Sequence, residues 1–343
     1  MIDSKRLFKA LLEKIRVPRV GTVVSFIVLL MMFPFLVRND SYILHITILA
    51  LVFAILTSSW NLIGGYTGIP SLSHHTFFGI GAYVSALLAI RVGISPWIGL
   101  FVAGGIAGLF GLALGTPCLR LKGKAYIVMM TIAFASIVEV LSKNLVDITG
   151  GEYGLWVPPF PDIPIPGVGV INLSGAVRMP YYYIILVIFL FVMYFLYTLI
   201  GSRIGFAFRA IHESEETAES VGINTTKYKL LSFFISSALA GIAGSTYAHY
   251  ILAIAPSSVF GISRMLDILA MTVIGGIGSF FGPMIGAFAI TILLEGLRAF
   301  GGYRLIVYGI LFVTAIILMP GGIARELQTI YYRLRKLVVL ETH

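Results

Sequence analysis

The sequence has 343 residues, of which 58% are hydrophobic and only 11% are charged, and its mean hydropathy is +0.98. Soluble domains carry about 25% charged residues, so this composition excludes an ordinary soluble protein and indicates a polytopic helical membrane protein. The net charge of +9 would suit a nucleic-acid partner, but 17 of the 24 Lys and Arg residues fall in four short hydrophilic segments. The single cysteine, Cys118, excludes an internal disulfide and any cysteine-rich metal site.

The chain begins with a basic tail, residues 1–20, followed by an apolar run without a small-residue cleavage site. This pattern predicts an uncleaved first span rather than a signal peptide. Apolar runs long enough to cross a bilayer predict an all-α integral membrane protein with about ten transmembrane helices. The expected spans are 21–37, 42–62, 76–91, 96–116, 125–142, 181–200, 230–252, 265–280, 283–299 and 303–319. They form one transmembrane domain over 21–319, followed by a tail over 320–343.

The placement of the basic residues predicts the orientation. Lys and Arg gather in the N-terminal tail, at 120–124, at 203–229 and in the C-terminal tail. Cytoplasmic segments of membrane proteins carry an excess of these residues. If the N-terminus is inside, ten crossings place all four segments in the cytoplasm. Both termini are therefore expected there, and the charge needs no nucleic acid to explain it.

Two glycine-rich stretches interrupt the apolar pattern. The first, 64–68, leads into 78–82, and the second, 275–278, leads into 282–287. Broken helices in both halves of a chain are typical of transport pathways built from repeats. Half-helices or re-entrant turns are alternatives to full spans at both places. Two related halves and a chance similarity both remain open.

Polar residues gather around the first break. They are Asn61, Ser71, Ser73, His74, His75 and Thr76. Polar side chains at membrane depth face a cavity or satisfy interrupted backbone, and both interpretations remain open here. No cysteine or carboxylate lies near the two histidines in sequence, so no metal site is predicted.

Small residues recur every four positions in two expected spans. They are Ala103, Ala107, Gly111 and Gly115 in the first, and Ser236, Ala240, Gly244 and Ala248 in the second. Such stripes let helix backbones approach closely. The interpretations are packing within the fold or packing against a second membrane subunit.

Glu139 lies near the outer end of its span and should face the protein interior or pair with Lys143 four residues later. A pathway role is the alternative. Asp267, Glu295 and Arg298 lie near span ends, where interfacial pairs are expected. The external loop 143–180 is rich in proline and is either a connector or part of a docking surface for an external partner.

The stretch 201–228 is a charged segment between two apolar runs. Ser214 is a suitable N-cap, with Glu215 and Glu216 in the first turn, where the helix dipole favours carboxylates. Gly222 can adopt the left-handed conformation that ends such a helix. A helix of about two turns is not stable alone, so this one should lean on the bundle or on another protein.

No catalytic motif is visible, and the chain has no Walker A, G-x-S-x-G or H-E-x-x-H sequence. The chain is therefore not expected to be an enzyme, to bind a cofactor or to hold ATP itself. Charges within the expected spans are few for a proton- or ion-coupled carrier. Energy for any transport would come from outside the chain.

Short motifs recur in a fixed order from about residue 42 to 323. In the first half they are Asn61-Leu62, Gly65, Gly68, Ser71-Leu72, His74, 77–83, Gly115, Pro117, 119–121, Gly123, Tyr126, 131–135, 149–151 and 154–155. In the second half they are 209–211, 216–218, 222–224, 228–230, 238–241 and the stretch from 275 to 287. In their order and spacing, these motifs resemble those of permease subunits of bacterial and archaeal ABC importers for branched-chain amino acids, specifically the M-type subunit of the hydrophobic amino acid uptake family.

The resemblance implies a permease that works by alternating access in the prokaryotic cytoplasmic membrane, among lipids. Its partners would be a second, H-type permease, two ABC ATPases that hold the ATP, and an extracytoplasmic substrate-binding protein. Glu216-Thr217-Ala218 stands where the family has its EAA loop, with Thr217 in place of alanine. The ATPase-coupling residues implied are Ser214, Glu215, Glu216, Thr217, Ala218 and Gly222.

A translocation pathway is expected along Asn61, Gly65, Gly68, Ser71, Ser73, His74, Thr131, Glu139, Gly275 and Gly276. Where relatives commonly read S-L-G-H-A-A, this chain has the more polar sequence of residues 71–76. The substrate therefore remains open among branched-chain and other amino acids, amides and urea. A self-sufficient carrier or channel is the alternative function, and a scaffold without transport is a weaker one.

Overall fold

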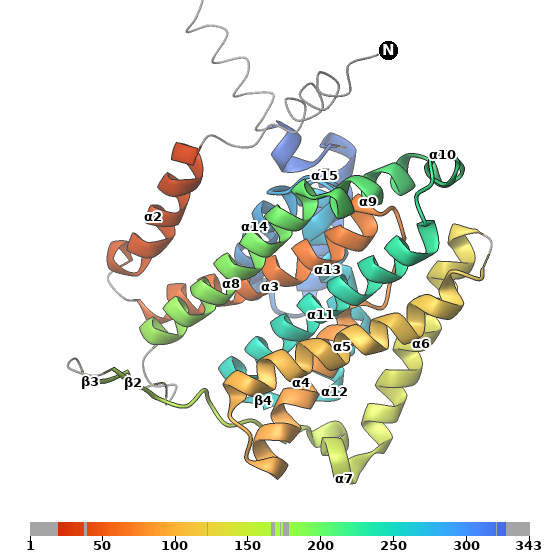
Figure 1. Ribbon diagram of the computed structural model, residues 1–343. Helices are drawn as coiled ribbons and strands as arrows, with labels where there is room; N and C mark the ends of the chain where they lie inside the picture. The colour runs from red at the N-terminus through yellow and green to blue at the C-terminus, as the bar shows by residue number, and fades with distance from the viewer. Residues whose placement is uncertain are drawn as a thin grey trace, which may run out of the picture.

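The computed structural model describes residues 20–37, 40–121, 123–165, 169–171, 173, 178–319 and 321–326. The predicted tails 1–20 and 320–343 lie almost entirely outside these described residues. The described part of the chain is a bundle of helices with two short pairs of strands (Figure 1). The all-α membrane class predicted from the sequence is confirmed in this form.

The helices follow the predicted apolar runs closely. The α-helices are α2 (Val20–Leu36), α3 (Ser41–Asn61), α4 (His74–Leu87), α5 (Pro96–Cys118), α6 (Lys124–Asn144), α7 (Val146–Thr149), α8 (Arg178–Gly201), α9 (Arg203–Glu213), α10 (Glu215–Ser220), α11 (Thr225–Ile251), α12 (Pro256–Val259), α13 (Ile262–Gly275), α14 (Gly282–Gly296) and α15 (Arg304–Leu318). Two π-helical turns, η1 (Leu62–Tyr66) and η2 (Leu88–Val92), extend α3 and α4, and two 3₁₀ segments are η3 (Gly151–Tyr153) and η4 (Leu297–Tyr303).

Each of the ten expected spans overlaps one of these helices, but their lengths differ. Among the described residues, 7 helical segments are long and apolar enough to cross a membrane. They are Ser41–Tyr66, His74–Val92, Pro96–Cys118, Lys124–Asn144, Arg178–Gly201, Thr225–Ile251 and Pro256–Gly275. Gly282–Gly296 is apolar but shorter. The chain is therefore a multi-pass membrane protein, whereas ten crossings and the orientation of the termini remain predictions.

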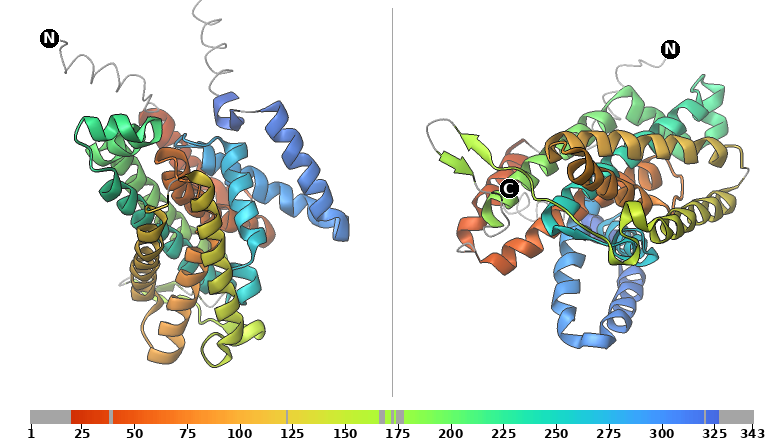
Figure 2. Two further views of the ribbon diagram at one scale, coloured as in Figure 1. Left: turned by 90° about the vertical axis from the view of Figure 1, so that its right-hand side faces the viewer. Right: turned by 90° about the horizontal axis from the view of Figure 1, so that it is seen from below.

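Helix α11 lies in the middle of the bundle against α5, α4 and α3 (Figure 1). Helices α9 and α10 lie at one end of the molecule, and α7 lies at the opposite end. The α14–α15 pair stands out from one side of the bundle (Figure 2). This arrangement separates the charged segment of α9 and α10 from the proline-rich loop by the full depth of the bundle.

Small residues bring α11 close to both neighbours. A Cβ added at Gly111 on α5 would meet the side chain of Ser237 on α11, and one added at Gly241 would lie 2.5 Å from the Cβ of Ala107. On the other side of α11, a Cβ at Gly244 would overlap the carbonyl of Phe78 on α4. The interpretation of the stripes as packing within the fold is confirmed at these positions.

The start of the proline-rich loop is fixed onto the bundle. Strand β1 (Leu155–Trp156) pairs antiparallel with β4 (Ala253–Ile254), and β2 (Ile163–Ile165) pairs with β3 (Gly169–Ile171). The His249 Nδ1 donates to the carbonyl of Pro158 at 2.7 Å, which leaves its Nε2 to accept from the Ser85 hydroxyl at 2.7 Å. The loop is thus tied at Pro158 to His249 of α11, which is in turn bonded to Ser85 of α4.

Candidate functional site

The charged segment predicted around Ser214 forms the expected short helix. The Ser214 Oγ accepts a hydrogen bond from the Thr217 N–H at 3.2 Å, and Glu215 and Glu216 occupy the first turn of α10. Gly222 has φ +85°, the left-handed conformation that suits glycine after a helix. The predicted cap, acidic turn and terminator are confirmed as local structure. Their role in coupling to an ATPase stays a prediction.

Helix α10 leans on the start of α11, as its short length requires. Ala218 is buried, the Thr225 hydroxyl donates to the Glu219 Oε1 at 2.6 Å, and Lys229 pairs with Glu215. Ala218 is the one buried residue of α10, and exposed positions without a contact named above are Glu216, Thr217, Ser220, Val221 and Gly222. A rigid face that combines charged, polar and apolar side chains is therefore presented away from the bundle.

Helix α9 is attached to both α8 and the first glycine break. The Arg209 Nη2 donates to the carbonyl of Ile200 at 2.7 Å, which satisfies one carbonyl at the C-terminal end of α8. The guanidinium of Arg209 also lies 4.7 Å from the ring centroid of Phe206. On the last turn of α9, the His212 Nδ1 lies 2.8 Å from the carbonyl oxygen of Gly65.

The two glycine breaks lie against each other, which the sequence did not predict. The Asn61 Nδ2 donates to the carbonyl of Ser279 at 2.9 Å, and its Oδ1 accepts from the Gly278 N–H at 2.8 Å. A Cβ added at Gly65 would lie 2.7 Å from the Gly278 nitrogen. The break between α3 and α4 and the break between α13 and α14 therefore form one junction.

The polar residues after the first break satisfy one another and the interrupted backbone. The Trp60 Nε1 donates to the carbonyl of Ser71 at 2.8 Å, and the Thr131 Oγ1 accepts from the Leu72 N–H at 3.0 Å. The hydroxyl oxygens of Ser71 and Ser73 are 3.1 Å apart. The predicted satisfaction of interrupted backbone is confirmed for Asn61, which bonds the backbone of Gly278 and Ser279, and Thr131 and Trp60 do the same for Leu72 and Ser71. A pathway role for this cluster stays a prediction.

His74 is held inside the cluster by one defined hydrogen bond. The Ser59 hydroxyl donates to the carbonyl of Leu56 at 2.7 Å, so the Ser59 oxygen accepts from the His74 Nε2–H at 2.8 Å. By contrast, the buried His75 Nδ1 and Thr76 Oγ1 have no hydrogen-bond partner among the described residues. These two atoms remain open to bind a ligand or a water molecule.

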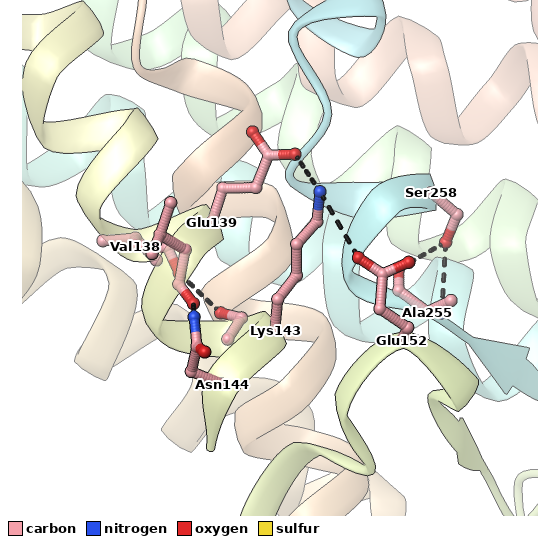
Figure 3. Close-up of polar contacts among 9 residues, drawn as sticks. Val138, Glu139, Lys143, Asn144, Glu152, Ala255 and Ser258 are labelled. Carbon is pink, nitrogen blue, oxygen red and sulfur yellow. Dashed lines mark hydrogen bonds and ion pairs between the residues drawn. The ribbon is translucent and has the colours of Figure 1, made fainter. Parts of the chain in front are cut away.

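Glu139 lies apart from the first break, near the C-terminal end of α6. The Lys143 Nζ is 3.0 Å from the Glu139 Oε1 and 3.7 Å from the Glu152 Oε1. Figure 3 shows the Lys143 ammonium between these two carboxylates. The predicted pairing of Glu139 with Lys143 is confirmed, and a pathway role for Glu139 stays a prediction.

The other predicted charge pairs are also present. The Arg298 Nη1 lies 3.0 Å from the Glu295 Oε1, and the Arg264 Nη1 lies 3.6 Å from the Asp267 Oδ2. In the second break, Gly276 has φ +120°, which ends α13 at Gly275 rather than at the predicted residue 280. The described residues contain no group of three or more His, Cys, Asp or Glu side chains placed to hold a metal ion.

The sequence did not predict that His212 contacts the junction of the two glycine breaks. The charge pattern drew attention to the acidic turn that follows it, and a single histidine at a helix end is an ordinary feature. Its partner, Gly65, is 147 residues away in the chain. No local pattern could have indicated that contact.

A family profile described as "Branched-chain amino acid transport system / permease component" matches residues 42–316. The chain therefore belongs to this family of transport permeases. It is 30% identical over 321 residues to the "High-affinity branched-chain amino acid transport system permease protein LivM" of Escherichia coli strain K12, which covers 88% of this chain and 73% of that relative. This similarity supports an M-type permease.

The chain is also similar to relatives named as LivH permease proteins. The chain is 26% identical over 288 residues to the E. coli permease protein LivH, covering 79% of this chain and 90% of the relative. It is also 26% identical over 275 residues to the probable LivH of Methanocaldococcus jannaschii, covering 75% and 83%. No solved structure matches the chain.

Proposed function

We propose that this chain is the M-type permease subunit of an ATP-driven importer and forms half of the translocation pathway for branched-chain or related amino acids. The second half would come from an H-type permease. Two ABC ATPase subunits would hold and hydrolyse the ATP, and an extracytoplasmic binding protein would deliver the substrate. The complex would reside in the prokaryotic cytoplasmic membrane. The amino acid substrate is inferred from the names of the relatives.

The observation that carries this proposal is α10. It is a short, capped helix whose exposed face carries Glu216 and Thr217, and it is attached to the bundle on its other side through Ala218 and Glu215. A helix built in this way can transmit force from a partner that binds its exposed face. Because the sequence has no phosphate-binding loop, the partner would supply the ATPase.

The pathway is proposed to run along the glycine junction and the polar residues beside it. Its lining would include Asn61, Gly65, Gly68, Ser71, Ser73, His74, Thr131, Glu139, Gly275 and Gly276. Irregular backbone at membrane depth is tolerated where it lines a cavity or is buried in protein. Movement at the junction would then open the pathway to one side of the membrane at a time.

Reconstitution separates this proposal from a self-sufficient carrier. With the H-type permease, both ATPases and the binding protein in proteoliposomes, uptake of a branched-chain amino acid should require ATP. A gradient alone should drive no uptake through the purified chain. ATP-independent uptake by the chain alone would instead support a secondary carrier or channel.

The orientation proposed for the ten-span topology can be tested with single cysteines. Cys118 is the single cysteine, so replacing it with alanine gives a background without thiols. One cysteine is then introduced at an exposed position, either Ser220→Cys on α10 or Tyr153→Cys in the loop. We expect a membrane-impermeant maleimide to label the Tyr153→Cys variant on intact cells and the Ser220→Cys variant only after lysis. Labelling of both variants on intact cells would contradict the proposed orientation.

The external loop offers a surface for the proposed binding protein. The side chains of Tyr153 and Trp156 are 99% and 85% exposed, and the β1–β4 pair holds this part of the loop in place. Exposed aromatic residues on a rigid support commonly dominate protein interfaces.

We expect Trp156→Ala to raise the concentration of binding protein needed for half-maximal stimulation of ATP hydrolysis by about tenfold, and to leave hydrolysis without binding protein unchanged. Val187→Ala, on an exposed apolar face of α8, is the matched control. If Trp156→Ala and Val187→Ala need the same concentration of binding protein for half-maximal stimulation, Trp156 belongs to the membrane interface and not to a docking surface.

A further inference from the structure

A chain of polar contacts leads from α9 to both glycine breaks. His212 lies two residues before Ser214, which caps both the C-terminus of α9 and the N-terminus of α10. Its Nδ1 contacts the Gly65 carbonyl at 2.8 Å, and a Cβ added at Gly68 would lie 3.1 Å from its ring. The imidazole therefore rests against the first break at two points.

The chemistry of this contact defines which atom donates. A carbonyl oxygen only accepts hydrogen bonds, so the His212 Nδ1 must carry the proton and donate to Gly65. Arg209, one turn earlier on α9, is already engaged with the Ile200 and Gly205 carbonyls. His212 is thus the side chain of α9 that joins it to the break between α3 and α4 by a hydrogen bond to Gly65.

The second contact in this series is made by Asn61, which joins the two breaks. Its side-chain amide donates one hydrogen bond to the Ser279 carbonyl and accepts one from the Gly278 N–H. One turn away on α3, the Thr57 hydroxyl lies 3.2 Å from the carbonyl of Pro283 at the start of α14. A displacement of the first break cannot leave the second in place without loss of these bonds.

We propose that His212 is a positioning residue for transport, through which movement of α10 displaces the Gly65 break, and that Asn61 makes the two breaks move together. This inference rests on the proposed function, because it assumes that an ATPase moves α10. Ser214 joins α9 to α10 with no intervening residue, so a displacement of α10 that moves Ser214 also shifts the His212 donor, two residues earlier. The Gly65 carbonyl then follows in order to keep its hydrogen bond.

Two substitutions at position 212 separate the hydrogen bond from the size of the side chain. In His212→Asn the amide nitrogen takes the approximate place of the imidazole Nδ1, whereas in His212→Gln it takes the approximate place of Nε2. In the complete reconstituted transporter, we expect His212→Gln and His212→Ala to raise the ATP hydrolysed per substrate imported by about fivefold. His212→Asn should stay close to the unsubstituted transporter.

The outcomes of this comparison are distinct. Equal coupling in all four proteins would overturn the role of His212, and a defect in His212→Asn as large as in His212→Gln would overturn the role of its Nδ1 donor. If the unsubstituted complex itself imports nothing with ATP, the proposed function fails, which is a different result. Because His212 lies on the exposed side of α9, the variants are expected to fold.

A second measurement needs no transport activity. In the purified chain, His212→Ala should speed amide hydrogen exchange at Gly278, in the other break, by about fivefold. Thr198→Ala on α8, whose hydroxyl contacts only carbonyls of its own helix, is the control. Unchanged exchange at Gly278 would show that the two breaks do not respond to His212 and would overturn the inference.

Discussion

Replacing Gly222 with valine is expected to reduce ATP-driven uptake by about tenfold or more while leaving the membrane bundle folded. Gly222 has φ +85°, which β-branched residues rarely adopt, so valine should unwind the end of α10. Among the described residues other than its two chain neighbours, none has an atom within 4 Å of an added Cβ, so the effect should come from backbone strain and not from a steric clash. Uptake and stimulated ATP hydrolysis in proteoliposomes measure the effect.

Gly222→Asn provides the matched control, because asparagine tolerates left-handed backbone far better than valine. It should retain most of the uptake. Equal uptake in the asparagine and valine variants would mean that the closing turn of α10 plays no part in coupling. Loss of uptake in both would instead indicate that the partner needs the open space beside Gly222 itself.

Replacing Gly244 with leucine is expected to have the largest effect on the fold. Helices α4 and α11 touch backbone to backbone at this point, since even a Cβ at Gly244 would overlap the Phe78 carbonyl. Backbone cannot move aside as a flexible side chain can, so the loss of stability should reach about 3 kcal/mol. Thermal unfolding in detergent, followed by size-exclusion chromatography, should show a lower midpoint or no folded protein.

Gly105→Leu is the control for this substitution. Gly105 lies on α5, and no described residue beyond its own stretch of helix has an atom within 4 Å of an added Cβ, so a leucine there meets open space. Its unfolding midpoint should match that of the unsubstituted protein. If Gly244→Leu gave the same midpoint as Gly105→Leu, close packing of α4 on α11 would not be required for the fold.

Much of the helical structure could be predicted from local patterns. Apolar runs and their glycine and proline borders placed every expected span on a helix, because hydrogen bonding within one segment is the way a backbone satisfies itself in lipid. The cap at Ser214 and the terminator at Gly222 were also predictable, since both depend on residues within one turn. The pairing of Glu139 with Lys143 follows from helical spacing alone.

Other features were predicted only as alternatives. The small-residue stripes fit close packing either within the fold or against a second subunit. The contacts of Gly111, Gly241 and Gly244 show that these three positions pack within the fold. The polar residues near the first break fitted either satisfaction of backbone or a pathway. The hydrogen bonds of Asn61 to Gly278 and Ser279 show the first for that residue and leave the second to experiment.

The sequence by itself determined the membrane class, the helices and the short capped helix α10, because each of these depends on residues that are close together in the chain. The tertiary structure alone decided that the two glycine breaks meet and that His212 contacts the first of them. The Asn61–Gly278 and His212–Gly65 hydrogen bonds join residues 217 and 147 positions apart. Such contacts exist only after the bundle has packed, so neither periodicity nor composition contains them.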